Sequence, residues 1–271
     1  MKHGKQNPAA TDAADLCKTT LNDDMMRHAT FIRSIFIGCL IWIMGTSGIQ
    51  SETTTAANPQ TYLQDVCTQL GKQWPKNRTI RIVCHGHSVP AGFFKTPVVD
   101  TFNAYPHLLH AGLKKRFPYA VIEVIVTAIG GENSISGEAR FEEEVLSLKP
   151  DVILIDYALN DRGAGLEKAK TAWASMIRQA KEQGVKTILL SPTADTRSDI
   201  SNPDDPLNQH AQQVRTLASE HQIGIVDSLA LFKAYMNEGN SLEELMSQIN
   251  HPNRKGHDLV ADALLEWFPK P

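Results

Sequence analysis

Five apolar segments of strand length, separated by segments of helical periodicity, constrain the fold of this 271-residue chain most strongly. The five are rich in Val and Ile, and they cover residues 79–84, 120–127, 151–156, 186–191 and 222–227. Between the third and the fourth, Leu166, Trp173 and Ile177 follow the three-and-four spacing of a helix that Gly184 would end. Strands alternating with helices predict a five-stranded parallel sheet covered on both faces, a three-layer α/β/α sandwich.

Size and charge narrow the classes of function. With 42% hydrophobic residues, a chain of this length can bury one substantial core, so one catalytic-size domain is expected. The formal net charge is -3, and the Lys and Arg residues are scattered along the chain. Because nucleic-acid binding needs a clustered basic surface, we expect no nucleic-acid partner.

The N-terminal part has the layout of a secretory signal. An apolar run occupies residues 31–49, with Arg27 and Arg33 on its N-terminal side and small polar residues after it. Its uninterrupted apolar part, residues 35–44, is shorter than the ~20 residues of a membrane span, although a retained signal anchor stays an alternative. We therefore expect an extension over residues 1–57, with the signal at about 25–50, and an exported domain over residues 58–271, periplasmic or extracellular. Unless the signal is retained, no membrane partner is expected for that domain.

Two cysteines, Cys67 and Cys84, remain outside the predicted extension. They could form a disulfide in an oxidising compartment. However, Cys84 lies in an apolar strand-like segment, which favours a buried free thiol.

Polar loops follow the first three predicted strands, where a parallel sheet gathers its ligand-binding residues. These loops are residues 86–88, 128–133 and 157–161. Far downstream, residues 250–253 precede an amphipathic helix whose apolar face includes Leu259, Val260, Ala263, Leu264 and Trp267. The sequence therefore predicts a site at one edge of the sheet.

The residue types in these loops fit nucleophilic catalysis. A serine hydroxyl is a poor nucleophile until a base takes its proton, and His251 could serve Ser88 in that way. The backbone N–H groups of Ser88 and Gly131 and the Asn160 amide could hold the oxyanion that forms. Each residue alone is common in caps and turns, so their order along one edge carries the prediction.

The sequence resembles the SGNH (GDSL-type) hydrolase family of esterases and lipases. That family has four sequence blocks, which match, in the same order and each in its own loop, Ser88, Gly131, Asn160 and His251. The resemblance covers about residues 78–268. It implies a flavodoxin-like sandwich with Ser88 as the nucleophile, Gly131 and Asn160 completing the oxyanion hole, His251 as the general base, and no cofactor. Gly130 is the alternative donor in the glycine block.

Three positions depart from the family pattern. His87 stands where Asp is usual, Ala158 where Gly is usual, and Gln248 where Asp is usual three residues before the catalytic His. Because neighbours in sequence normally diverge, His87 is expected to point away from Ser88. The change at Gln248 removes the usual orienting carboxylate, a loss that costs about 10⁴ in rate in the serine-protease template.

Three explanations for Gln248 stay open. A main-chain carbonyl or the Gln248 oxygen could orient His251, or the protein could bind substrate without turning it over. Alternatively, an acid could come from the loop at residues 193–206, whose aspartates are Asp195, Asp199, Asp204 and Asp205. That long polar loop could also border the pocket and select the substrate.

The preferred function is a serine esterase acting on a small-molecule or carbohydrate ester, with short acetyl groups favoured. A lipase-like or thioesterase-like member of the same family and a catalytically degenerate carbohydrate-binding protein are the alternatives. A metal-dependent hydrolase is a further alternative, since zinc could use side chains near the first strand. The candidates for such ligands are Cys84, His85, His87, His107 and His110.

Overall fold

A computed structural model of the protein describes residues 54–270. The predicted signal at about 25–50 lies outside these residues, so export stays a prediction. Within residues 54–270, no helix combines the length and the apolar character that crossing a bilayer requires.

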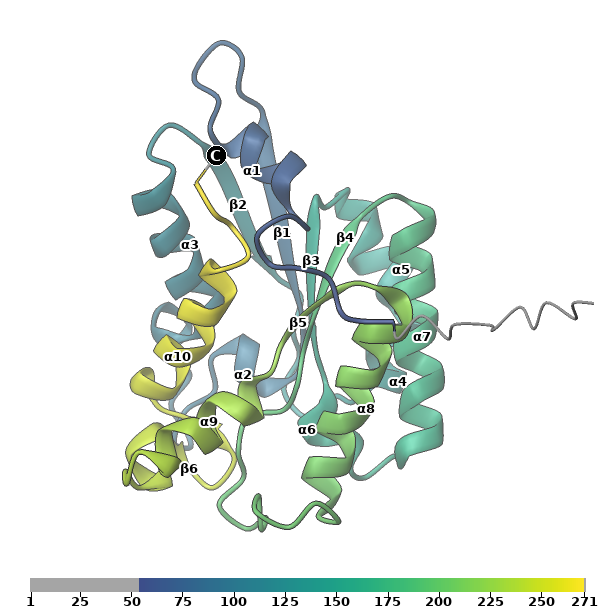
Figure 1. Cartoon of the computed structure of the whole chain (residues 1–271), viewed down its shortest axis with the longest axis vertical. Coiled ribbons are helices and arrows are strands. Elements are labelled where there is room, and N and C mark those ends of the chain that lie inside the picture. The colour runs from purple at the N-terminus through teal and green to yellow at the C-terminus, as the bar shows by residue number, and fades with distance from the viewer. Residues whose placement is uncertain (1–53, 271) are drawn as a thin grey trace, which may run out of the picture. The chain divides into compact units, whose positions relative to one another are not determined.

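Five parallel strands form the central sheet (Figure 1). They are β1 (Thr79–Gly86), β2 (Val121–Val126), β3 (Val152–Asp156), β4 (Lys186–Leu190) and β5 (Gly224–Val226). Their order is β2-β1-β3-β4-β5, which places β1 between two neighbours and β2 and β5 at the edges. The predicted α/β/α class with a five-stranded parallel sheet is confirmed, and this strand order is the flavodoxin-like one.

Strand pairing sets the lengths of the first and last strands. β1 continues two residues beyond the predicted segment, because His85 and Gly86 pair with Ile155 and Asp156 of β3. β5 is shorter than its apolar segment, since only residues 224–226 pair with β4. The extension of β1 brings its end level with the end of β3.

Helices cover both faces of the sheet (Figure 1). One layer contains α1 (Gln64–Leu70), α3 (Tyr105–Arg116), α9 (Ser228–Asn237) and α10 (Arg254–Leu265), and the other contains α4 (Ser134–Ala139), α5 (Phe141–Glu144), α7 (Leu166–Glu182) and α8 (Pro206–His221). Each helix layer packs on the sheet through its own hydrophobic core, and successive β3 residues alternate between the two cores. Val152 and Leu154 face the first layer, whereas Ile153 and Ile155 face the second. Burial on both faces explains why this strand reads as an uninterrupted apolar run.

Short elements connect the layers. Two four-residue helices, α2 (Ser88–Ala91) and α6 (Ala158–Asp161), follow β1 and β3. A small antiparallel pair, β6 (Met246–Gln248) and β7 (His251–Pro252), precedes α10. The 3₁₀ helices are η1 (Thr101–Asn103), η2 (Leu146–Leu148) and η3 (Leu242–Leu245). In Figure 1, α2, α6 and β6 lie toward the lower end of the sheet, where β1 and β3 end.

Both described cysteines are buried free thiols. Cys67 belongs to α1 and Cys84 to β1, and both pack in the core of the first layer. Burial, with a smaller effect of Asp65, raises the pKa of Cys67 to about 11. The structure therefore agrees with the preferred interpretation of a buried thiol.

Asp161 joins the loops after β2 and β3 to α7. Its carboxylate is fully buried, and its Oδ1 accepts the backbone N–H of Ser134 at 2.7 Å. Its Oδ2 accepts the indole N–H of Trp173, also at 2.7 Å. One carboxylate therefore satisfies two buried donors, the backbone N–H at the start of α4 and the indole N–H of a core residue of α7.

Replacement of Asp161 by Ala should lower the free energy of unfolding by about 2 to 6 kcal/mol, because each of the two orphaned buried donors costs about 1 to 3 kcal/mol. Urea unfolding monitored by circular dichroism measures the change. Asp262→Ala, at an exposed position of α10, is the matched control and should change the stability by less than about 0.5 kcal/mol. Equal stabilities of the two variants would contradict the role of Asp161.

Candidate active site

Ser88 lies at a tight turn between β1 and α2. The strand ends at Gly86, and Ser88 is the first residue of the helix, with His87 as its N-cap. A Cβ at Gly86 would lie 2.5 Å from the carbonyl oxygen of Asp156, so only glycine allows this close approach of β1 to β3. The turn presents the Ser88 side chain at the carboxyl edge of the sheet.

His251 reaches the same point from a region 163 residues further along the chain. Its Nε2 lies 2.9 Å from the Ser88 Oγ, within hydrogen-bond distance. The exposed fractions are 7% for Ser88 and 9% for His251, so surrounding protein shields the pair from most of the solvent. The β6–β7 pair and the start of α10 hold His251 there, since Asn253 caps that helix by accepting the Gly256 N–H.

Two groups face the other ring nitrogen, Nδ1 of His251. The carbonyl oxygen of Phe94 lies 3.1 Å away, and the Nε2 of Gln248 lies 2.6 Å away. A main-chain carbonyl and Gln248 thus occupy the place of the family's carboxylate. The Gln248 side chain presents its nitrogen to the ring, and not the oxygen that was one of the predicted ways to orient it.

The alternative that an acid from the loop at 193–206 orients His251 is wrong. Asp195 is fully buried but binds Arg162 and Arg197, which hold its pKa at about 2 against the opposing effect of burial. Asp199 accepts from Ser201, and Asp205 caps α8. Within residues 54–270, no aspartate is bonded to His251, whose Nδ1 is occupied by Phe94 and Gln248.

Burial lowers the pKa of His251 below the ordinary value of a histidine. The Phe94 carbonyl opposes this shift, because it can accept a hydrogen bond from the Nδ1–H of the charged ring, and His87 adds to the shift as a second imidazole nearby. The net effect keeps His251 neutral near physiological pH, as a general base requires.

His87 does not point away from Ser88, contrary to the prediction. Its Nδ1 lies 3.5 Å from the Ser88 Oγ because the ring turns back over the start of α2, where this nitrogen accepts the Val89 N–H at 3.2 Å. Its Nε2 lies 3.3 Å from the Asp156 carboxylate, in an orientation that does not make a hydrogen bond. Since the Nδ1 lone pair is engaged by Val89, His251 is the better acceptor for the Ser88 proton.

The glycine loop and the Asn160 loop meet beside Ser88. The Ile129 N–H donates to the Gly86 carbonyl at 3.0 Å, which fixes the loop after β2 against the end of β1. The Asn160 Nδ2 donates to the Glu132 carbonyl at 2.8 Å, next to Gly131. The structure therefore gathers the loops that carry all four predicted site residues at one edge.

Gly130 and Gly131 have different surroundings. A Cβ at Gly130 would lie 2.8 Å from the Phe93 ring, so the aromatic side chain packs directly on this backbone. Gly131 has a φ of 84°, and a Cβ there would meet no atom within 4 Å. Gly131 therefore needs the backbone freedom of glycine, whereas Gly130 is required by the close approach of Phe93.

A partly buried network behind these loops was not predicted from the sequence. Arg140 binds the Glu132 carboxylate through two nitrogens, at 2.6 and 3.0 Å, and also contacts the Tyr157 hydroxyl. That hydroxyl lies 3.1 Å from the Nε2 of His85, whose pKa burial lowers to about 4. The network supports the same Glu132 whose carbonyl holds Asn160.

The candidate metal ligands do not converge. His85 contacts Thr127 and the Gly137 carbonyl, His87 contacts Val89, and His107 lies against Phe102. In the part of the chain from 54 to 270, no group of three or more His, Cys, Asp or Glu side chains is arranged to hold a metal ion.

A hollow of about 510 Å³ adjoins the predicted site. Asn160 lines it on one side and Asn250, the neighbour of His251, on the other. Arg162, Arg197 and Ser198 add polar groups from the loop after β4. The Thr196 N–H donates to the Ile249 carbonyl at 2.8 Å, which joins that loop to the segment carrying His251.

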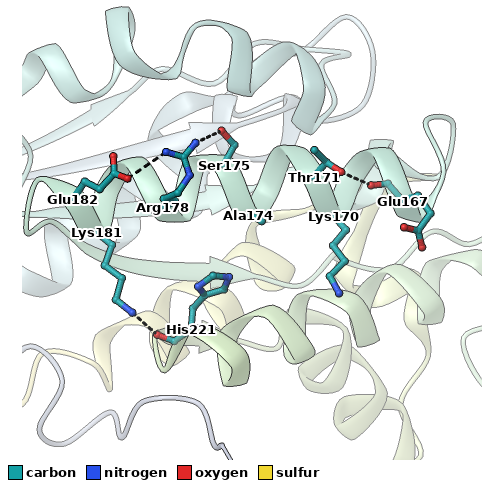
Figure 2. A pocket seen from close by; sticks show the side chains of 9 residues that line it. All are labelled: Glu167, Lys170, Thr171, Ala174, Ser175, Arg178, Lys181, Glu182 and His221. Carbon is teal, nitrogen blue, oxygen red and sulfur yellow. Dashed lines mark hydrogen bonds and ion pairs between the residues drawn. The ribbon is translucent and has the colours of Figure 1, made fainter. Parts of the chain in front are cut away.

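A larger hollow of about 820 Å³ lies along α7 (Figure 2). Its wall consists of α7 side chains and His221 at the end of α8. Figure 2 shows Arg178 bound to Ser175 and Glu182 on this surface, and Lys181 bound to the His221 carbonyl. None of the predicted site residues lines this hollow.

A parallel α/β/α sandwich with a serine–histidine pair at the carboxyl end of an inner strand defines a class of hydrolases. The sequence model of the GDSL-like Lipase/Acylhydrolase family matches residues 84–259. The chain therefore belongs to this family, and it is a hydrolase acting on ester bonds. The resemblance to SGNH (GDSL-type) hydrolases is confirmed. A search of curated proteins found no match.

Solved structures with the same fold include two groups of esterases. The two-domain esterase CEX, active on acetylated mannans, superposes with a TM-score of 0.62 at 21% identity, covering 76% of this chain and 52% of that one. The acetylxylan esterase Axe2 from Geobacillus stearothermophilus gives a TM-score of 0.60 at 22% identity, covering 70% of this chain and 94% of that one. The chain thus spans about half of the two-domain esterase. At these identities the comparisons establish the fold alone.

The pH dependence of ester hydrolysis should reflect the lowered pKa of His251. A general base works in its neutral form, so kcat/KM should fall as the pH drops through this pKa, with a midpoint below about 6.5. Initial rates between pH 4 and 9 on an uncharged ester measure the profile. A midpoint clearly above 6.5 would contradict the assignment.

Proposed function

We propose that the protein is a serine esterase that hydrolyses short acyl esters of carbohydrates through an acyl-serine intermediate. The 2.9 Å contact between the Ser88 Oγ and the His251 Nε2 carries this proposal. Support comes also from the turn that presents Ser88 at the sheet edge and from the loops of Gly131 and Asn160 beside it.

In the first step, the Ser88 Oγ attacks the carbonyl carbon of the ester while its proton passes to the His251 Nε2. The carbonyl oxygen becomes an oxyanion, which the N–H groups of Ser88 and Gly131 and the Asn160 amide stabilise. The protonated His251 then gives its proton to the oxygen of the leaving alcohol. The bond between the acyl carbon and that oxygen breaks, and an acyl-serine remains.

In the second step, water attacks the acyl carbon and His251 takes one of its protons. The bond to the Ser88 Oγ breaks, the proton returns to that oxygen, and the carboxylic acid leaves. Every proton therefore passes through the Nε2 of one histidine, and no cofactor enters the cycle.

A carbohydrate alcohol suits the polar hollow beside Asn160. Hydroxyl groups of a sugar could bond to Arg197, Ser198 and Asn250 there, beside the predicted oxyanion-hole residue Asn160. The exposed Phe93 ring, 6.1 Å from the His251 ring between centroids, offers an apolar surface to the same substrate. The named activities of CEX on acetylated mannans and of Axe2 as an acetylxylan esterase favour acetyl as the acyl group.

We further propose that the protein is exported, from the signal-like layout of residues 25–50. An exported esterase of near-neutral charge would meet extracellular polysaccharide fragments directly.

Removal of either member of the pair should abolish turnover. Ser88→Ala and His251→Ala should each lower kcat/KM for p-nitrophenyl acetate by about 10³-fold or more, because the two residues act as a unit. A serine-directed organophosphorus reagent should leave one adduct on Ser88 of the wild type, seen by mass spectrometry.

Circular dichroism serves as the control for folding in both variants. Full activity of Ser88→Ala would refute the serine mechanism. Acetylated oligosaccharide bound by the wild type without an adduct or turnover would instead indicate a degenerate carbohydrate-binding protein.

Substrate selection should depend on Arg197. Arg197→Ala should raise KM for acetylated xylo- or manno-oligosaccharides by about three- to tenfold, the effect of one lost hydrogen bond, and leave KM for p-nitrophenyl acetate unchanged. Acetate release measures the first and absorbance the second. Arg178→Ala, in the hollow along α7, removes the same charge elsewhere and should change neither. Equal effects of both variants on the oligosaccharides would count against this hollow as the sugar site.

A further inference from the structure

The Nδ1 of His251 faces two groups with opposite requirements. The carbonyl oxygen of Phe94, 3.1 Å away, only accepts hydrogen bonds, so it favours a proton on Nδ1. The amide nitrogen of Gln248, 2.6 Å away, only donates, so it favours a bare Nδ1. One ring nitrogen cannot satisfy both, and each neighbour therefore selects a different tautomer of His251.

The orientation of the Gln248 amide is fixed at its other end. Its Oε1 accepts the backbone N–H of Thr96 at 3.0 Å and lies 3.3 Å from the Thr96 hydroxyl. A backbone N–H only donates, so the amide oxygen must face Thr96 and the nitrogen must face His251. A flipped amide would set two donors against each other at Thr96.

The choice of tautomer decides whether His251 can accept the Ser88 proton. With the proton on Nδ1, the Nε2 lone pair faces the Ser88 Oγ at 2.9 Å and can take its proton. With the proton on Nε2, the same nitrogen donates to Ser88 and cannot act as a base. A carboxylate in place of the amide would accept from Nδ1 and remove the conflict.

We propose that Gln248 is a positioning residue that holds resting His251 in the Nε2-protonated form and so restrains the activity. The shorter contact, 2.6 Å against 3.1 Å, favours Gln248 over Phe94 in the resting enzyme. Turnover proceeds from the fraction of molecules in which Phe94 holds the Nδ1 proton. The effect on rate rests on the proposed function, whereas the tautomer is a property of the folded protein alone.

The same amide disfavours the charged ring that forms during catalysis. When His251 takes the Ser88 proton, both of its nitrogens carry hydrogen, and the Gln248 N–H then faces the Nδ1–H. Only the Phe94 carbonyl stabilises that form from the Nδ1 side. A carboxylate would add charge stabilisation, as the acid of a serine triad does.

Gln248→Glu tests the proposal with an isosteric change. One carboxylate oxygen keeps the Thr96 N–H, and the other accepts from Nδ1 of His251. Nitrogen-15 NMR of histidine-labelled protein, at a pH above the His251 pKa, should show the Nε2–H tautomer in the wild type and the Nδ1–H tautomer in Gln248→Glu. Loss of the signal in His251→Gln identifies it. An Nδ1–H tautomer in the wild type would overturn the proposal, whether or not any ester is hydrolysed.

Kinetics give the second readout. Gln248→Glu should raise kcat on p-nitrophenyl acetate by about tenfold or more, with little change in KM, because the productive tautomer becomes the main one. The acidic limb of the pH profile should move to higher pH, since a carboxylate stabilises the charged imidazole and raises its pKa.

Gln183→Glu, at an exposed position after α7, is the charge-matched control and should leave both the rate and the pH profile unchanged. If the Gln248→Glu protein is folded and Ser88 reacts with the organophosphorus reagent, but kcat does not rise, the restraining role of Gln248 is overturned. Absence of Ser88-dependent turnover in every variant would refute the proposed function, and the NMR result would still decide the tautomer.

Discussion

The pairing of β1 with both β2 and β3 is the constraint on which the rest of the site depends. β1 lies inside the sheet, so its carboxyl end is flanked by the loops that follow its two neighbours. The absence of a side chain at Gly86 lets the end of β1 approach the Asp156 carbonyl, and Ser88 follows two residues later. The parallel sheet thus brings the loops that follow β2 and β3 beside the turn that carries Ser88, although long crossover connections separate these segments in the sequence.

Two sets of side-chain interactions hold the loops around Ser88 and His251 in place. Asp161 joins the start of α4 to Trp173, and the Glu132–Arg140 ion pair lies behind the loop that holds Asn160. These interactions hold the oxyanion-hole candidates in place before substrate arrives, which is the condition for strong electrostatic stabilisation.

Two departures from the family pattern, His87 and Gln248, lie next to Ser88 and His251. His87, in the usual place of an aspartate, caps α2 and faces the buried Asp156 carboxylate, so a carboxylate still lies close to this turn. Gln248 is different, because its amide meets the very ring nitrogen that a carboxylate would orient. The first exchange leaves the Ser88–His251 contact intact, whereas the second acts on the tautomer of its base.

The sequence by itself determined the fold class and the family, and it placed the candidate site residues in loops of one edge. Hydrophobic periodicity and the polar residues after each strand are local patterns. They are therefore visible in the sequence itself and were enough to predict the loops of Ser88, Gly131, Asn160 and His251. Only the tertiary structure decided what faces the Nδ1 of His251. The Phe94 carbonyl is a main-chain group with no signature in residue type, and Thr96 meets Gln248 across 152 positions of the chain. The direction of the ring of His87 and the Arg140 network likewise depend on packing between distant segments, which no local pattern encodes.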